Sequence, residues 1–424
     1  MAPSTTRRGL LAAAGTVLLA GCSELRSGSD DDRISSYHLP DHTDDGDAEP
    51  VIVETLPLAI EQAELTARAE RTTALLGTLP LPLTAEDIPN GYVRMQLLDA
   101  AERAGTYLDE ARGARNRFAA LQYLRRARAQ ARYAAAGWAY TEGEATESAL
   151  EDEHDTAVED AESLQSEQAY RGDDPVRAAL VYGTVERDLH YAVEARDPHH
   201  RADDTLLAVA EWGEHAERAR ATVDDSRYLY DRFLDSLPED AGSVEGTLET
   251  AAETVADDLE TRRQALQPVP TDAHERRFYR LRHELRDSVE DGAKRVAGAP
   301  GPASAVLTAT TSLVGAMAYD RVLERLEGEN GIELEDAEDV RAARETAVEA
   351  LTTALAESRR PALVRPTLAD AAWQVAYADE ELARFNGDLR VERLDSPVGR
   401  YVRATAQARS APGACEQVLD ALGE

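Results

Sequence analysis

From about residue 56 to the end of the chain, apolar residues recur at intervals of three and four. This is the period of an α-helix, and the interval of two that marks a β-strand is missing. Clusters of Gly and Pro interrupt the pattern often enough to predict about 11 to 14 helices, many of them about 20 residues or longer. The only strand-like run is "VIV" at 51–53. Without strands a parallel sheet cannot form, so the sequence disfavours nucleotide-binding folds and α/β substrate-binding architectures and predicts an all-α fold.

The expected helices are too long for the common short-repeat solenoids, and no repeat signature is satisfied. We therefore expect one or more long-helix bundles, with an irregular α-helical array as the alternative. The helical region is divided into a domain over 51–240 and a second over 241–424, continuous with the first. Three Ala-rich helices each carry one tryptophan, and these are expected to be core anchors: Trp138, Trp212 and Trp373.

Proline positions predict several helix boundaries, because proline is favoured in the first turn of a helix. Three dipeptides are expected to start helices: Asp174-Pro175, Ser396-Pro397 and Ala411-Pro412. The run from Val296 to Tyr319 carries no charge but contains two prolines and several hydroxyl side chains. It predicts a buried central helix from about Ala303, not a membrane span.

The charge composition is unusual in two respects. The chain has 81 Asp and Glu against 46 Lys and Arg, for a formal net charge of −35, and Lys294 is its only lysine. This combination resembles the proteins of extremely halophilic archaea. At 1 M salt the Debye length is only ~3 Å, so a surplus of carboxylates repels itself weakly. We therefore expect a protein adapted to high salt.

The N-terminus, "TTRRGLLAAAGTVLLAGC", resembles the export signal of a lipoprotein. Arg7 and Arg8 form a twin-arginine pair, and an uncharged stretch follows that is too short for a stable membrane span. Leu19 to Cys22 resemble a lipobox. The resemblance implies that 1–21 is a signal peptide for twin-arginine export. It also implies that cleavage before Cys22 makes this residue the N-terminus and that its sulfur carries lipid. The protein would then sit on the outer face of the cytoplasmic membrane.

Residues 22–50 are expected to comprise the lipidated Cys22 and a disordered acidic tether, since 23–50 hold acids and few large apolar groups. If Cys22 carries lipid, Cys415 is the only remaining thiol and no intramolecular disulfide can form. Stability must then come from packing.

A basic island stands out within this acidic chain. Residues 111–141 contain arginines but no acid, and Arg125, Arg128 and Arg132 line up on one side of the expected helix. The following segment, 142–174, is strongly acidic, with a stripe at Leu150, His154, Ala157, Ala161 and Leu164. The favoured interpretation is an antiparallel hairpin of a basic and an acidic helix with charges paired across its seam. The alternative is that the three arginines face outward and bind an anionic partner.

A smaller basic cluster lies at 274–286, "HERRFYRLRHELR". Its arginines are Arg276, Arg277, Arg280, Arg282 and Arg286. It is expected to be either a second anion-binding surface or an exposed helix face. Nucleic acid is excluded as a partner, because the net charge is repulsive and counterion-driven binding collapses at high salt.

No phosphate loop, nucleophile elbow or paired-cysteine motif is present, so the sequence assigns no catalytic residue. The one metal hypothesis places Glu186 and His190, four apart, opposite Glu211 and His215, also four apart. If their helices are antiparallel neighbours, these side chains could converge on a divalent transition metal. Chance Glu–His spacings are frequent in so acidic a chain.

Two functions follow as hypotheses. The first is a lipid-anchored, extracytoplasmic helical scaffold or interaction protein of the cell envelope, whose partner is an envelope protein or an acidic glycan. The second is a metal-binding protein or metal-dependent enzyme that uses the 186–215 helix pair; the first hypothesis needs no cofactor. The sequence does not determine the oligomeric state.

Overall fold

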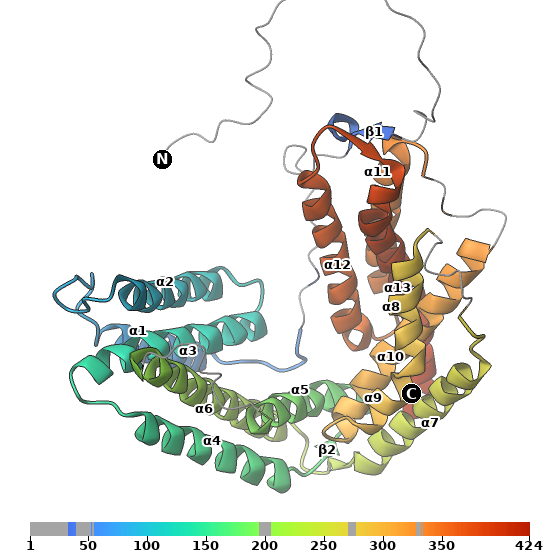
Figure 1. The fold of residues 1–424 in the computed structure, drawn as a ribbon. Helices are drawn as coiled ribbons and strands as arrows, with labels where there is room; N and C mark the ends of the chain where they lie inside the picture. Colours follow the sequence, from blue (N-terminus) through green and yellow to red (C-terminus); the bar gives the residue numbers. More distant parts are fainter. Residues whose placement is uncertain are drawn as a thin grey trace, which may run out of the picture.

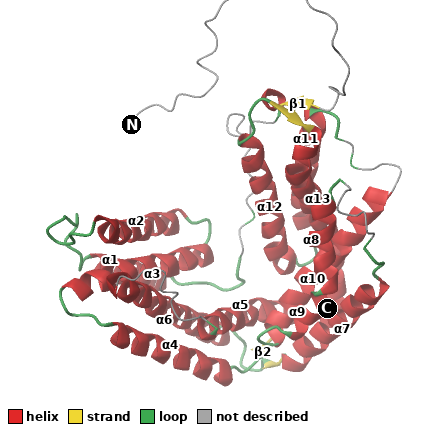
Figure 2. Cartoon of the chain, viewed as in Figure 1, coloured by secondary structure: helices red, strands yellow, loops and turns green. Residues whose placement is uncertain are grey.

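The computed structural model describes residues 33–39, 52, 55–194, 205–269, 277–327, 332 and 334–424. Over these residues the chain is built from thirteen α-helices, as the apolar periodicity predicts (Figure 2). The helices are α1 (Gln62–Leu76), α2 (Gly91–Gly113), α3 (Arg117–Thr141), α4 (Glu147–Glu167), α5 (Pro175–Val193), α6 (Thr205–Asp235), α7 (Glu245–Ala265), α8 (Tyr279–Glu290), α9 (Gly292–Ala297), α10 (Pro302–Glu327), α11 (Ala337–Glu357), α12 (Pro361–Ala383) and α13 (Asp395–Leu422). The all-α prediction is confirmed.

The helices form a curved array, with the N-terminal helices in one arm and the C-terminal helices in the other (Figure 1). In the first arm α3 packs against α1, α2 and α6, and α4 packs along α6. In the second arm α13 packs against α10, α11 and α12. Helix α5 contacts both α6 and α10 and so joins the arms. One large apolar core holds residues from both arms, so the array has a continuous interior.

Local signals place several helix starts. Asp174 precedes Pro175 and its carboxylate accepts a hydrogen bond from the backbone N–H of Arg177 at 3.0 Å, which caps α5. Pro397 lies in the first turn of α13. The prediction of a start at Pro412 is wrong, because α13 continues through that residue. A proline inside a helix removes one backbone hydrogen bond. Burial of the neighbouring alanines between packed helices compensates for that loss.

The uncharged run around Ala303 forms α10, most of whose residues are buried, so the prediction of a central helix is confirmed. None of the described helices combines the length and the apolar character that a membrane-spanning helix needs.

Part of the expected acidic tether is folded. Strand β1 (Arg33–Ser35) pairs antiparallel with β4 (Asp388–Arg390), and the backbone N–H of Ser36 donates to the carbonyl oxygen of Gly387 at 2.9 Å. Ile34 and Leu39 are buried at the end of the second arm. The prediction of disorder across 22–50 is therefore wrong for 33–39, where these apolar side chains give the segment a surface to bury. The other two strands, β2 (Arg171–Gly172) and β3 (Gly242–Ser243), pair in a second two-stranded sheet.

All three tryptophans are predicted to be core anchors, but the structure buries one fully, buries one partly and leaves one exposed. Trp212 is buried and Trp138 is half-buried against the first-arm core. Trp373 is 62% exposed on α12, so the prediction of a core anchor is wrong there. It lies on the face of α12 opposite to the buried Leu368 and Val375.

Candidate functional site: an arginine and aromatic groove

The basic island forms an internal ion-pair network. Arg125 on α3 donates from Nε to Asp225 of α6 at 3.0 Å and from Nη2 to Asp188 of α5 at 2.8 Å. Arg128, also on α3, donates from Nε to Glu217 of α6 at 2.9 Å. The Asp225 and Glu217 side chains are only 1% and 2% exposed. These arginines are therefore occupied by the chain itself and do not form a docking surface.

The partner of the island differs from the predicted one. Only Arg132 reaches the acidic segment, through Glu153 of α4 at 3.1 Å. The predicted stripe of α4 is buried, but it faces α6, where the His154 ring meets the Trp212 ring edge-on at 5.7 Å. The predicted antiparallel hairpin of α3 and α4 is therefore wrong. Helix α6 lies between them and supplies the carboxylates instead.

Helix α1 adds two more arginines to the same carboxylates. Arg68 donates to Asp225 at 2.6 Å, and Arg71 donates to Glu217 at 2.9 Å. Burial raises the pKa of Glu217, but the hydrogen bonds and charges of Arg71 and Arg128 outweigh it, so the pKa lies below its ordinary value. The network thus holds α1, α3 and α6 together through buried charge pairs.

The four proposed metal ligands are not brought together. Glu186 is buried and points to the N-terminus of α10, where it accepts hydrogen bonds from the backbone N–H groups of Ser304 at 2.6 Å and Ala303 at 3.2 Å. His190 is exposed on α5. Within the described ranges no three His, Cys, Asp or Glu side chains are placed to hold a metal ion, so the predicted convergence with Glu211 and His215 is not found. Glu186 instead caps a helix, which its helical spacing could not reveal.

Replacing Glu186 by glutamine should change how stability depends on pH. Burial is the main cause that raises the pKa of Glu186 above its ordinary value, although the N–H groups of α10 oppose it. Because the pKa of Glu186 is higher in the folded than in the unfolded protein, its protonated carboxyl group adds to the free energy of unfolding. This contribution is complete below the ordinary pKa of 4.5 and is lost as the pH rises through the pKa of the folded protein. We expect the free energy of unfolding of the wild type to decrease relative to that of Glu186→Gln as the pH rises, by at most about 1.4 kcal/mol per pH unit. Denaturant unfolding from pH 4 to 8 measures it, and a pH-independent difference contradicts it.

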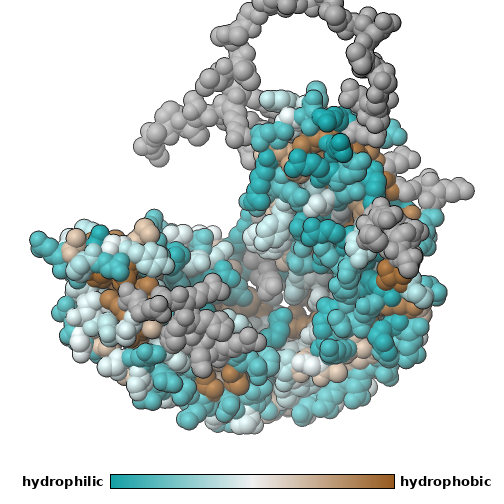
Figure 3. Space-filling view, viewed as in Figure 1, coloured by the Kyte–Doolittle hydropathy of each residue, from teal (hydrophilic) through white to brown (hydrophobic). Residues whose placement is uncertain are grey.

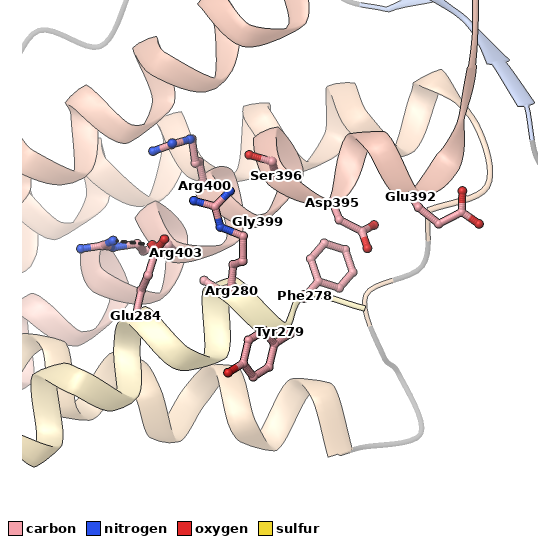
Figure 4. Close-up of a pocket in the computed structure, with 11 residues that line it drawn as sticks. Phe278, Tyr279, Arg280, Glu284, Glu392, Asp395, Ser396, Gly399, Arg400 and Arg403 are labelled. Carbon is pink, nitrogen blue, oxygen red and sulfur yellow. Dashed lines mark hydrogen bonds and ion pairs between the residues drawn. The ribbon is translucent and has the colours of Figure 1, made fainter. Parts of the chain in front are cut away.

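A groove in the second arm has a different character from the network. It lies between α8 and the start of α13 and encloses a cavity of about 280 Å³. Figure 4 shows Arg280 extending from α8 across the groove toward Gly399 of α13, and Arg400 extending from α13. The lining residues are Phe278, Tyr279, Arg280, Leu281, Glu284, Glu392, Asp395, Ser396, Gly399, Arg400 and Arg403.

The arginines of the groove are unequally paired. Arg403 donates to Glu284 at 3.0 Å across the groove. Arg400 donates to the amide oxygen of Gln374 at 2.8 Å, while its nearest carboxylate, Glu381, is 3.6 Å away. Arg280 is exposed and makes no hydrogen bond or ion pair with any residue of the described segments. A guanidinium that makes no bond to the carboxylates around it leaves its donors available to a ligand.

Two exposed aromatic residues lie on α12, near Arg400 of the groove. Trp373 is 62% exposed and Tyr377 is 51% exposed. Their ring centroids are 5.9 Å apart, with planes inclined at 36°. The guanidinium of Arg400 lies 6.0 Å from the Tyr377 ring and connects this pair to the cavity. Trp373 is one of only three tryptophans in the chain, and the other two are buried or half-buried.

The local backbone also departs from the ordinary at this place. Phe278, which precedes α8, has a φ of 57° and lies in the left-handed region, which side chains other than glycine rarely adopt. Its ring is buried, and Arg277 beside it donates to Asp395 of α13. Strained residues of this kind are held by their surroundings and cluster at binding sites. The buried Phe278 ring and the Arg277–Asp395 pair maintain this conformation and hold α8 against the start of α13.

Sequence reasoning found this groove only in part. The cluster at 274–286 contains Arg277 and Arg280, while Arg276 lies outside the described residues. The partners on α12 and α13 were missed. A usable signal exists for α12: Trp373 and Tyr377 are four apart, on the side opposite its buried residues. Arg7, Arg8 and Cys22 also lie outside the described residues.

The face of the molecule in Figure 3 is largely hydrophilic, with apolar groups confined to scattered patches.

Residues 63–240 match a family model described as a domain of unknown function (DUF8262), and residues 245–420 match a second one (DUF8264). No curated protein and no solved structure matches the chain. The two matched regions cover the helices of the first arm and of the second arm in turn.

Proposed function

We propose that the protein is a lipid-anchored interaction protein outside the cytoplasmic membrane, which binds an anionic partner through the groove of α8, α12 and α13. One observation carries the proposal: Arg280, which no described residue pairs, lines the same cavity as Arg400, and the Arg400 guanidinium lies 6.0 Å from the ring of the exposed Tyr377. Trp, Tyr and Arg are the side chains that dominate the energy of binding surfaces. They are gathered here in a chain whose other surface is mainly acidic.

The buried network supports this choice of site by contrast. Arg125 and Arg128 are satisfied by carboxylates of their own chain and stabilise the first arm. Arg280 contributes nothing comparable to the described part of the second arm, and an exposed Trp373 loses the free energy that burial would give it. Side chains that stabilise neither the core nor a helix pair are better explained by binding.

The proposed location of the protein in the cell rests on the N-terminal signal alone. The twin-arginine pair Arg7 and Arg8 and the lipobox ending at Cys22 imply export and lipidation. Strand β1 begins at Arg33, a short distance in sequence after Cys22, and pairs with β4 of the second arm. In our proposal the anchor therefore leaves from the end of the second arm, and the groove is held close to the membrane.

The proposal is tested in cells at native salt. A photo-crosslinking amino acid in place of Tyr377 should attach to an envelope component, whereas one in place of Tyr92, which is 59% exposed on α2, should not. Cys22→Ser should move the protein from the membrane fraction to the soluble fraction, because the acyl chains are lost. Identical adducts at the two positions contradict the binding site, and recovery of unlipidated wild type from the cytosol contradicts the address.

A further inference from the structure

We propose that the groove binds an acidic oligosaccharide, whose sugar ring stacks on Trp373 and Tyr377 and whose carboxylate or sulfate is held by Arg280 and Arg400. This inference rests on the proposed function and names the partner of the same site. The aromatic pair offers a shallow, exposed platform with planes inclined at only 36°. The carbon-bound hydrogens of one face of a sugar ring carry slight positive charge, and the face of an aromatic ring is negative. A pyranose ring fits such a platform.

The anion is held by the arginines at the edge of this platform. Arg400 is fixed by Gln374 at 2.8 Å and by the Tyr377 ring at 6.0 Å. Arg280 extends toward it from the facing helix (Figure 4). Guanidinium groups bind a carboxylate or sulfate through two parallel hydrogen bonds, which specify geometry as well as charge. An acidic group on a sugar stacked over Tyr377 lies close to Arg400, which shares its cavity with Arg280.

The carboxylates of the groove decide between a sugar and a more strongly charged ligand. Glu284, Glu392 and Asp395 line the same cavity as the arginines. They repel a polyanion or a run of acidic side chains, but they accept hydrogen bonds from hydroxyl groups. The groove therefore suits a ligand with one negative group and several hydroxyls, which is the composition of an acidic sugar. An acidic peptide has the charge without the hydroxyl donors.

High salt favours the same kind of ligand. Simple charge attraction is screened over ~3 Å at 1 M salt. Stacking on the Trp373 and Tyr377 rings is apolar and does not weaken with salt. Short, directed hydrogen bonds from Arg280 act within the screening length. A site that combines these two contributions keeps its affinity where a diffuse basic surface would lose it.

The test measures binding of an acidic tetramer, a tetrasaccharide of three galactose residues and one galacturonic acid, to the full-length protein in detergent. Binding is measured by titration calorimetry at the salt that supports the fold. A neutral galactose tetramer and a hepta-glutamate peptide are measured in parallel. Trp373→Ala and Arg280→Gln should each weaken binding of the acidic tetramer about tenfold or more. The matched controls are Tyr92→Ala, also an exposed aromatic residue, and Arg220→Gln, an exposed arginine of α6. Both controls should bind like the wild type.

The outcomes separate this inference from the proposed function. Equal binding of the neutral and the acidic tetramer overturns the role of the arginines. Binding of hepta-glutamate alone, weakened by Trp373→Ala, overturns the sugar ligand and leaves an interaction protein with a protein partner. Binding of the acidic tetramer that neither groove variant reduces places the ligand elsewhere and overturns the inference. None of these results depends on Cys22 or on where the protein is found.

Discussion

Replacing Asp225 by alanine should lower the free energy of unfolding by about 3–5 kcal/mol, the usual cost of leaving a buried charge without its partner. The Asp225 side chain is 1% exposed and accepts hydrogen bonds from Arg68 and Arg125. Its removal takes the buried carboxylate from both guanidinium groups, and leaves Arg125 with Asp188 and Arg68 with Glu64, whose side chains are more exposed. Denaturant unfolding at the salt that supports the fold measures the loss, with the fluorescence of Trp138 and Trp212 as the signal.

A surface pair provides the control for this prediction. Asp109 pairs with Arg112 on α2, but the two side chains are 76% and 73% exposed. Exposed pairs contribute little to stability. Asp109→Ala should therefore leave the unfolding midpoint where it is. Because buried pairs are screened less than exposed ones, the loss in Asp225→Ala should persist as salt rises. A loss no greater than that of Asp109→Ala would show that the network does not stabilise the first arm.

The buried faces and the starts of several helices could be predicted, because both depend on residues close together in the sequence. The stripe of α4 from Leu150 to Leu164 is buried as its spacing indicates, and Asp174 and Pro175 start α5. Pro412 misled the prediction, because packing around α13 outweighs a local preference against proline. The helix propensity of single residues determines helix boundaries where tertiary contacts are few, and tertiary packing overrides it where contacts are many.

Partners distant in sequence could not be predicted in this way. Arg125 meets Asp225 across 100 positions, while the acidic segment directly after α3 is the nearer choice in sequence. The groove has the same property: Arg403 and Glu284 are 119 positions apart. In a chain with 81 acids every arginine has many carboxylates to choose from, so charge pattern alone does not select one. Helix packing selects it, and packing is set by shape.

Shape at the junction of α3 and α6 is set by Gly213. A β-carbon at this position would lie 2.4 Å from the β-carbon of Ala136 and 3.2 Å from the backbone oxygen of Arg132. Neither atom can rotate away, so a larger side chain must push the helices apart. Gly213→Val should therefore destabilise the protein by about 3 kcal/mol or more, at the upper end of overpacking costs. Thermal and denaturant unfolding measure this effect.

The same substitution at Gly105 isolates the steric contribution. Gly105 lies inside α2, and a β-carbon added there would meet no described atom within 4 Å. Valine is slightly better than glycine in a helix interior, so Gly105→Val should be neutral or stabilising by a few tenths of a kcal/mol, roughly. A second test exchanges the two small residues: Ala136→Gly should restore much of the stability lost in Gly213→Ala, because the β-carbon then has room from the other side. If Gly213→Val behaves like Gly105→Val, the close approach of α3 and α6 does not exist in solution, and the arginine network that depends on it would have to be arranged differently.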